Sequence, residues 1–145
     1  MMRYVRLYTD EVGDSRFEDV VLEAEPQGVS YDADLMASFS DPIPAVEVFL
    51  RNVVKEASSV EPHNAPRRQF IVQLTGESEV ETSTGEVRRF GPGSIMLLED
   101  TDGKGHITRG LSGGERLTLV VALPDDPASW RPATVSASGS HAAPS

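Results

Sequence analysis

The sequence predicts a single all-β domain in which two sheets pack face to face. Its 145 residues include ten prolines and twelve glycines, which divide the chain into short segments. These segments are rich in Val, Ile, Phe and Thr and show no long helical period, a pattern that favours strands joined by tight turns. Roughly eight to ten such strands are typical of a sandwich or jelly roll, a double sheet that hides its edges.

The first part of the chain contains three predicted strands and one irregular connection. Tyr4–Tyr8 and Phe17–Ala24 alternate weakly between apolar and polar residues, and residues 46–51 alternate more clearly. In the last of these, Val46, Val48 and Leu50 share one face, and Glu47, Phe49 and Arg51 share the other. Gln27–Pro44 contains prolines and scattered acids without a period, so we expect an irregular connection with a turn of helix over Ala33–Ala37.

The predicted strand over residues 69–75 has apolar residues on both of its faces. One face carries Phe70, Val72 and Leu74, and the other carries Gln69, Ile71 and Gln73. We expect the first face to pack on a sheet and the second to line a cavity with a few polar groups. An amide buried without a partner costs about 1 to 3 kcal/mol, so Gln69 and Gln73 should meet water, a ligand or each other.

Five more strands are predicted in the remainder of the chain. They cover Glu79–Thr82, Val87–Phe90, Ile95–Leu98, Lys104–Arg109 and Leu117–Leu123. With the earlier strands they complete one domain over residues 1–126.

The last segment, residues 127–145, has a different composition. It is small and polar, with little besides Trp130 and Val135 to bury. Such a sequence cannot offset the entropy of ordering its backbone, so we expect a disordered tail in which Trp130 is the candidate to dock back onto the body. The histidine in this tail, His141, is expected to be exposed to solvent.

Charge and composition exclude several classes of function. The net charge is −10, and no Lys/Arg cluster with interleaved aromatics occurs, so a nucleic-acid partner is not expected. The chain has no cysteine, which excludes disulfides, cysteine nucleophiles and thiolate metal sites. There is no secretory stretch and no run of about 18 apolar residues, so we expect a cytoplasmic protein without a membrane partner.

Two of the three histidines, His63 and His106, flank the predicted central strands. Histidine is suited to metal ligation and proton transfer because its pKa is about 6.5 and its neutral ring offers a lone pair. With Gln69 and Gln73 on the inward face of residues 69–75, we expect both imidazoles to point into the same pocket from neighbouring strands.

The order of these residues resembles the first motif of the cupin superfamily, G-x5-H-x-H-x3,4-E-x6-G. His63 takes the place of the first histidine, Gln69 that of the glutamate, and Gly76 that of the closing glycine. Ala65 stands where the second histidine would be.

The following residues resemble the second cupin motif, G-x5-P-x-G-x2-H-x3-N. Gly85, the Pro92-Gly93 pair and His106 follow its order, with extra residues before the proline and before the histidine. The two motifs span residues 63–106, and the resemblance implies a single cupin jelly-roll barrel.

The resemblance also implies a divalent metal, Zn, Ni, Fe or Mn, held by three histidines and a glutamate. Here only His63, His106 and the amide of Gln69 remain as ligands. An amide oxygen is a weaker donor than a carboxylate and supplies no charge, so we expect any metal to be weakly bound.

Two acidic residues near the second motif could restore the ligand set. Asp100 or Asp102 would supply the carboxylate of a site with two histidines and one carboxylate, as in non-haem iron centres. The alternative is that both serve the turn at residues 100–103, because Asp-Thr-Asp-Gly is good turn chemistry.

Single-domain cupins of similar size include polyketide cyclases, sugar epimerases and isomerases. The resemblance therefore implies a small-molecule lyase, isomerase or cyclase of the kind found in secondary metabolism, with a metal-dependent dioxygenase and a non-catalytic binding protein as alternatives. The candidate catalytic residues are His63, His106 and Gln69, and the candidate substrate-binding residues are Arg67, Gln73 and Lys104. Arg67 has a second interpretation, as a surface arginine paired with an acid.

Small cupins pair through their N-terminal strands, and the resemblance implies the same here. The alternating Tyr4–Tyr8 strand has no obvious partner in the sequence. Because an unpaired edge strand invites another chain, we expect a twofold homodimer that covers it.

Overall fold

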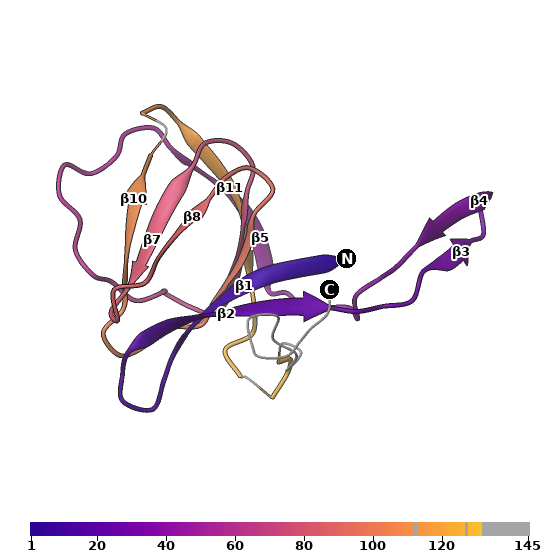
Figure 1. Ribbon diagram of the computed structural model, residues 1–145, viewed down its shortest axis with the longest axis horizontal. Coiled ribbons are helices and arrows are strands. Elements are labelled where there is room, and N and C mark those ends of the chain that lie inside the picture. Colours follow the sequence, from indigo (N-terminus) through magenta and orange to yellow (C-terminus); the bar gives the residue numbers. More distant parts are fainter. Residues whose placement is uncertain (112, 127, 132–145) are drawn as a thin grey trace.

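The computed structural model describes residues 1–111, 113–126 and 128–131, and these residues form strands and turns without any helix (Figure 1). The all-β prediction is therefore confirmed for this part of the chain. It contains no helix that is long and apolar enough to cross a membrane. The tail predicted to be disordered, with His141, lies outside the described residues beyond Arg131.

The described residues form eleven strands. They are β1 (Met2–Thr9), β2 (Ser15–Leu22), β3 (Gln27–Val29), β4 (Asp32–Ala37), β5 (Glu47–Val53), β6 (Gln69–Gln73), β7 (Ser78–Thr82), β8 (Val87–Phe90), β9 (Ile95–Leu98), β10 (His106–Gly110) and β11 (Arg116–Ala122). The strands predicted from alternation all occur, with ends that differ by a few residues.

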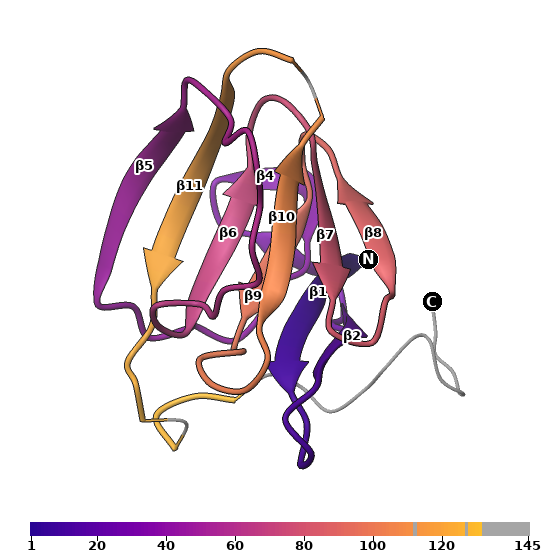
Figure 2. The ribbon, with the colours of Figure 1, turned by 90° about the vertical axis from the view of Figure 1, so that its left-hand side faces the viewer.

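Two sheets make the body of the molecule. A six-stranded sheet has the order β2-β1-β9-β6-β11-β5, and a three-stranded sheet has the order β10-β7-β8. The smaller sheet faces the larger one, and Figure 2 looks onto the pair from the side of the smaller sheet. A two-stranded sheet, β3-β4, projects away from this body (Figure 1).

The closed barrel predicted from the sequence is not formed, because no strand ladder among the described residues joins the two main sheets. Side chains bridge one seam: the Ser15 amide donates to the Ser83 hydroxyl at 2.8 Å, and Arg88 pairs with Asp19 at 2.7 Å. At the other seam a single backbone bridge joins His63 to His106. The body is thus a two-layer sandwich with an open side.

The expectation that the Tyr4–Tyr8 strand forms an open edge is wrong. β1 lies inside the large sheet, antiparallel to β2 and parallel to β9. The parallel partner follows some 90 residues later in the chain, at Met96 to Leu98, and strand alternation alone does not reveal such a distant pairing. The edges of the large sheet are β2 and β5.

The irregular connection expected within Gln27–Pro44 is found only over residues 38–44, and the helical turn expected over Ala33–Ala37 is wrong. β3 and β4 form an antiparallel hairpin with a register shift at Gly28/Val29. Residues 32–35 read Asp-Ala-Asp-Leu, a period of two that fits a strand, and the amide of Asp34 is capped by the Asp32 carboxylate at 3.0 Å. The two strands were not predicted because neither contains a long apolar run.

The large sheet buries apolar side chains on both of its faces. Between the sheets, Leu7, Met96 and Leu98 pack with residues of the small sheet such as Val80. On the outer face, a second cluster contains Phe70, and Trp130 packs on it with ring centroids 5.7 Å apart. The expected docking of Trp130 onto the body is confirmed.

A buried ion network holds this C-terminal segment in place. Glu99 accepts from Arg68 Nε at 2.8 Å and from Arg6 Nε at 2.5 Å. The remaining Arg68 nitrogens donate to the carbonyl oxygens of Pro124 and Trp130 at 3.1 and 2.8 Å. Arg68 is buried, and each of its three side-chain nitrogens has a partner within the protein.

Replacing Glu99 by glutamine should destabilise the fold strongly, because it leaves the buried Arg68 charge without a counterion. We expect the free energy of unfolding in urea to fall by about 3 kcal/mol for Glu99→Gln. The matched control is Glu47→Gln, which removes the acid of an exposed ion pair and should cost about 0 to 1 kcal/mol. Equal losses in the two variants would contradict a structural role for the network.

Candidate functional site

A cavity of about 430 Å³ lies between the two sheets and opens beside His63. Its volume falls within the range of small-molecule sites. The described residues that line it are Phe49, Arg51, His63, Ala65, Pro66, Gln69, Ile71, Gln73, Ser78, Val80, Met96, Leu98, His106, Thr108, Arg116, Thr118 and Val120. Apolar and polar residues contribute about equally in number to this wall.

Strand register places the lining residues in rows across the large sheet. Directly opposed residues of antiparallel strands point to the same face. Phe49, Val120, Ile71 and Met96 form one such row across β5, β11, β6 and β9, and Arg51, Thr118 and Gln73 form the next. The predicted inward face of residues 69–75 is thereby confirmed, because Gln69, Ile71 and Gln73 all line the cavity.

The two histidines meet at the wall of this cavity. Their backbones exchange two hydrogen bonds of 2.9 Å, and their ring centroids lie 4.5 Å apart. The prediction that both point to one pocket is confirmed. His106 is buried and His63 is exposed at the mouth.

Gly105 makes this close approach possible. Its φ is +76°, and a Cβ atom at this position would lie 2.5 Å from the carbonyl oxygen of His63. For both reasons, any other residue at position 105 would require the backbone to shift. The glycine before His106 therefore sets the contact between the two histidine segments.

Asp100 holds His106 from behind. Its side chain is fully buried, and one carboxylate oxygen is hydrogen-bonded to His106 Nδ1. The other oxygen, Oδ1, has no partner among the described residues. The Asp100 carbonyl accepts from the Ala65 amide at 3.1 Å, which ties the same residue to the first motif. Asp100 is not a lining residue, and its carboxylate supports His106 from outside the cavity.

One nitrogen of each ring is left without a hydrogen bond to the described residues. His106 Nδ1 is used by Asp100, and His63 Nδ1 lies 3.3 Å from the Glu61 carbonyl oxygen. The Nε2 atom of either ring has no hydrogen bond to a described residue. Two imidazole nitrogens are therefore available to a molecule in the cavity.

Gln69 adds a free amide to these groups. It is only 8 % exposed, and its side chain makes no hydrogen bond to the described residues. Gln73 is different, because its Nε2 donates to the Thr75 carbonyl oxygen at 2.7 Å and only its oxygen remains free. A buried amide without a partner costs free energy unless a bound molecule or water satisfies it.

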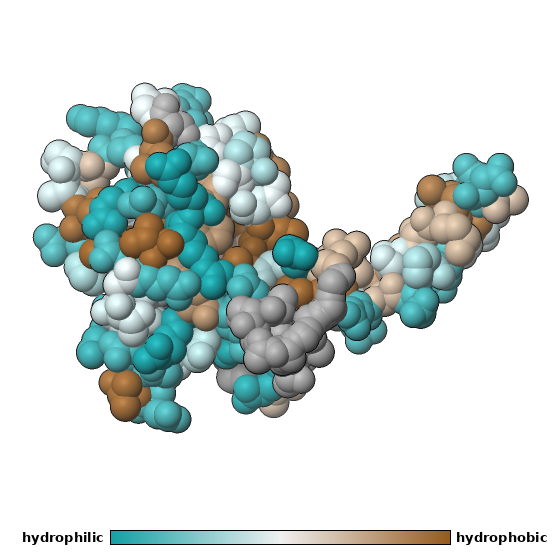
Figure 3. All heavy atoms as spheres, in the orientation of Figure 1, coloured by the Kyte–Doolittle hydropathy of each residue, from teal (hydrophilic) through white to brown (hydrophobic). Residues whose placement is uncertain are grey.

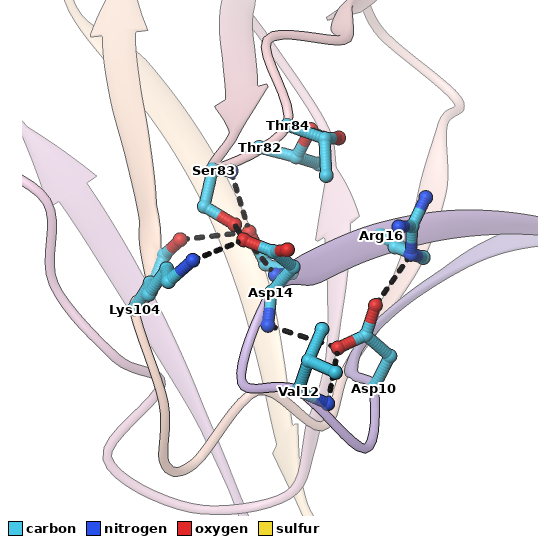
Figure 4. Close-up of polar contacts among 10 residues, drawn as sticks. Asp10, Val12, Asp14, Arg16, Thr82, Ser83, Thr84 and Lys104 are labelled. Carbon is cyan, nitrogen blue, oxygen red and sulfur yellow. Dashed lines mark hydrogen bonds and ion pairs between the residues drawn. The ribbon is translucent and has the colours of Figure 1, made fainter.

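Two predicted substrate-binding residues lie away from the cavity. Arg67 pairs with Glu47 at 2.9 Å on the surface, which agrees with its second interpretation. Lys104 pairs with Asp14 at 2.8 Å, and Figure 4 shows its amine and the Ser83 hydroxyl meeting at that carboxylate. In each case the basic side chain forms an ion pair with an acid from another strand or turn. Local alternation in the sequence does not predict such a partner.

Asp102 also lies outside the cavity, contrary to its candidacy as a metal ligand. Its carbonyl oxygen accepts from Thr9 Oγ1 and from Asn64 Nδ2, each at 2.8 Å. The backbone of Asp102 therefore joins the β1 end to the first motif, and the turn interpretation is the better one.

Sequence reasoning missed five polar residues of the cavity: Arg51, Ser78, Thr108, Arg116 and Thr118. The alternation over residues 46–51 places Arg51 on the same face as Phe49, so this pattern could have predicted that Arg51 lines the cavity. Arg116 is buried and donates to both carboxylate oxygens of Glu56 at 2.6 and 3.2 Å, which lowers the pKa of that carboxyl. Arg51 makes no ion pair within the described part of the chain.

The donor set does not fit a strong divalent metal site. It consists of two imidazoles and a neutral amide, and the described residues contain no group of three His, Asp or Glu side chains arranged to hold a metal. The Asp100 carboxylate is engaged by Nδ1 of His106. The affinity of a site for such metals depends on how many carboxylate and imidazole ligands it provides.

Comparison with known proteins gives limited similarity. No protein-family model and no curated protein matches the sequence. Among solved structures, protein NMB1881 from Neisseria meningitidis is similar at 12% identity over 59% of this chain and 88% of that chain, with a TM-score of 0.39. A putative ethanolamine utilization protein EutQ from Salmonella typhimurium LT2 is similar at 14% identity over 87% of this chain and 98% of that chain, with a TM-score of 0.41. Both scores are too low to carry a conclusion on fold or function.

Restoring the two altered ligands should create a metal site. Ala65 lines the cavity beside the histidines, so Ala65→His with Gln69→Glu adds an imidazole and a carboxylate where the first motif would have them. We expect zinc affinity, measured by competition with a chromogenic chelator, to rise by about 10-fold or more. The control is the double variant with His106→Ala added, which should lose the gain. Unchanged affinity in the double variant would contradict the assignment of this wall.

Proposed function

We propose that the protein is a small-molecule enzyme of the lyase, isomerase or cyclase type, with the cavity between its sheets as the active site. The observation that carries the proposal is the Asp100–His106 pair at the cavity wall, beside His63 and the free Gln69 amide. The motif order and the two facing sheets support a cupin-like jelly roll as the scaffold.

His106 is the general base of the proposed reaction. The Asp100 carboxylate accepts from Nδ1, which fixes the neutral ring with its proton on that atom and its lone pair on Nε2. The Nε2 lone pair then takes a proton from a carbon next to a substrate carbonyl group. Asp100 is a positioning residue that also stabilises the imidazolium once it has formed.

Gln69 and His63 complete the reaction. The Gln69 side-chain NH₂ donates to the carbonyl oxygen as negative charge develops on it. In an isomerisation, the proton returns from His106 or His63 to a different atom of the substrate, so no net proton is gained or lost. In an elimination, the bond to the leaving group breaks and His63 supplies the proton that this group takes away.

The cavity indicates the kind of substrate. Its apolar residues, including Phe49, Ile71 and Met96, would surround a hydrocarbon or aromatic body. A carbonyl or hydroxyl group of the substrate would bind beside the histidines and Gln69, and the row of Arg51, Thr118 and Gln73 offers further polar contacts. Arg51 at the wall makes no direct ion pair with a described residue, although its charge helps to lower the pKa of Glu56, and it would pair with an acidic substituent.

A non-catalytic binding protein is the second candidate, and the free Gln69 amide favours it equally, because a ligand could satisfy that amide without reacting. A metal-dependent dioxygenase needs a ligand set that these residues do not fit. The two surviving candidates differ in whether the histidines move a proton.

Proton transfer can be tested by NMR in deuterated solvent. A panel of small keto acids and aromatic ketones is incubated with the protein, and deuterium incorporation next to the carbonyl is followed. We expect exchange of at least one compound to be accelerated, and His106→Gln and Asp100→Asn to lower that rate about 100-fold or more. Arg67→Gln, on the surface, is the control and should leave the rate unchanged.

Binding of panel compounds, measured by thermal shift, separates the two candidates. Binding without deuterium incorporation would favour the binding protein and contradict the enzyme. An exchange rate unaffected by His106→Gln would contradict the assigned base even if the protein proves to be an enzyme.

A further inference from the structure

The β3-β4 hairpin and its connections form an arm, residues 23–42, that extends into solvent. Figure 1 shows it leaving the body on the side opposite the small sheet. None of its residues is buried. A two-stranded hairpin without further packing is marginally stable in water, so its ordered state requires another surface.

The arm carries apolar side chains that its own body does not cover. They are Tyr31, Leu35, Met36 and Phe39, of which Met36 is 59% exposed. Figure 3 shows hydrophobic side chains along the arm and on the side of the body nearest to it. Isolated exposed apolar residues are ordinary, but four on one short projecting segment indicate an interaction site.

The outer face of the large sheet offers a matching surface. Strand register aligns two apolar rows there across β5, β11, β6 and β9. One row is Val48, Val121, Phe70 and Leu97, and the other is Leu50, Leu119, Val72 and Ile95. Trp130 covers part of the first row, whereas Leu50 in the second is 64% exposed. An antiparallel sheet normally presents polar residues on an uncovered face.

A groove of about 560 Å³ on the same face connects these rows to the arm. Val72, Ile95 and Val121 line it, together with Ser40 and Ile43 from the end of the arm and the segment that follows it. The arm therefore starts from the edge of the apolar face and leads away from it. If a second molecule packed against this face, the arm of the first molecule would lie across the apolar rows of the second.

Charge is complementary between the arm and the groove. Residues 23–41 contain five acidic residues and no Lys or Arg. Arg3 lines the groove, and its guanidinium donates only to the Met1 sulfur among the described residues. An acidic arm from another molecule would bring a carboxylate to this unpaired cation, although the net charge of −10 opposes association elsewhere.

We propose that two copies of this chain form an arm-exchanged dimer, in which each arm packs on the outer face of the partner's large sheet. The twofold arrangement is closed, since each molecule gives one arm and receives one. It covers the apolar rows, the arm and the groove at once. The interface lies behind the sheet that lines the cavity, so the dimer is independent of the proposed enzyme activity.

Sedimentation equilibrium of the full chain tests the association. We expect a dimer at micromolar concentration, and a monomer when residues 27–38 are replaced by a short Gly-Ser linker or when Leu50→Glu places a charge in the second row. Val12→Glu is the matched control, because Val12 is equally exposed in the β1–β2 turn, far from this face, and should leave the dimer intact. Circular dichroism establishes that each variant is folded.

Paramagnetic relaxation in mixed samples tests the exchange itself. The chain has no cysteine, so Met36→Cys accepts a single spin label. This chain is mixed with ¹⁵N-labelled wild type, and we expect broadening of the amides of Leu50, Val72 and Leu119 on the labelled chain. A monomeric wild type, a dimer that survives arm removal, or a dimer without this broadening would each overturn the proposal.

Discussion

The contact between the segments of His63 and His106 is the constraint on which the site depends. It is made by two backbone hydrogen bonds at the open seam between the sheets, where no strand ladder is available among the described residues. The contact requires a residue without Cβ at Gly105. One short bridge thus joins the two segments beside the cavity and sets the distance between the two imidazoles.

The polar groups of the cavity are held from outside it. Asp100 holds His106, Glu56 holds Arg116, and the Thr75 carbonyl holds the Gln73 amide. Asp100 and Glu56 lie outside the strands of the residues that they orient, and Thr75 follows Gln73 by two residues. A side chain fixed in this way loses little conformational entropy when a ligand binds, which favours both catalysis and specific recognition. Gln69 differs because its amide has no such support.

Local patterns in the sequence predicted the features that depend only on the alternation of side chains along a strand. The alternation over residues 69–75 correctly placed Gln69 and Gln73 in the cavity, and the motif order brought the two histidines together. The roles of Arg67 and Lys104 depended on contacts with acids in distant segments, and that of Asp100 on the turn that brings it to His106, neither of which alternation encodes. The same limit explains the wrong edge at Tyr4–Tyr8, whose second partner strand lies far along the chain.

The central claim is that Asp100 fixes His106 as a base whose free lone pair faces the cavity. Long-range ¹H–¹⁵N correlation NMR of the imidazoles measures this directly, and three histidines give a spectrum that single substitutions can assign. In the neutral form of the ring, we predict protonated Nδ1 and bare Nε2 for His106, and loss of that preference in Asp100→Asn. A neutral His106 with its proton on Nε2 in the wild type would contradict the account.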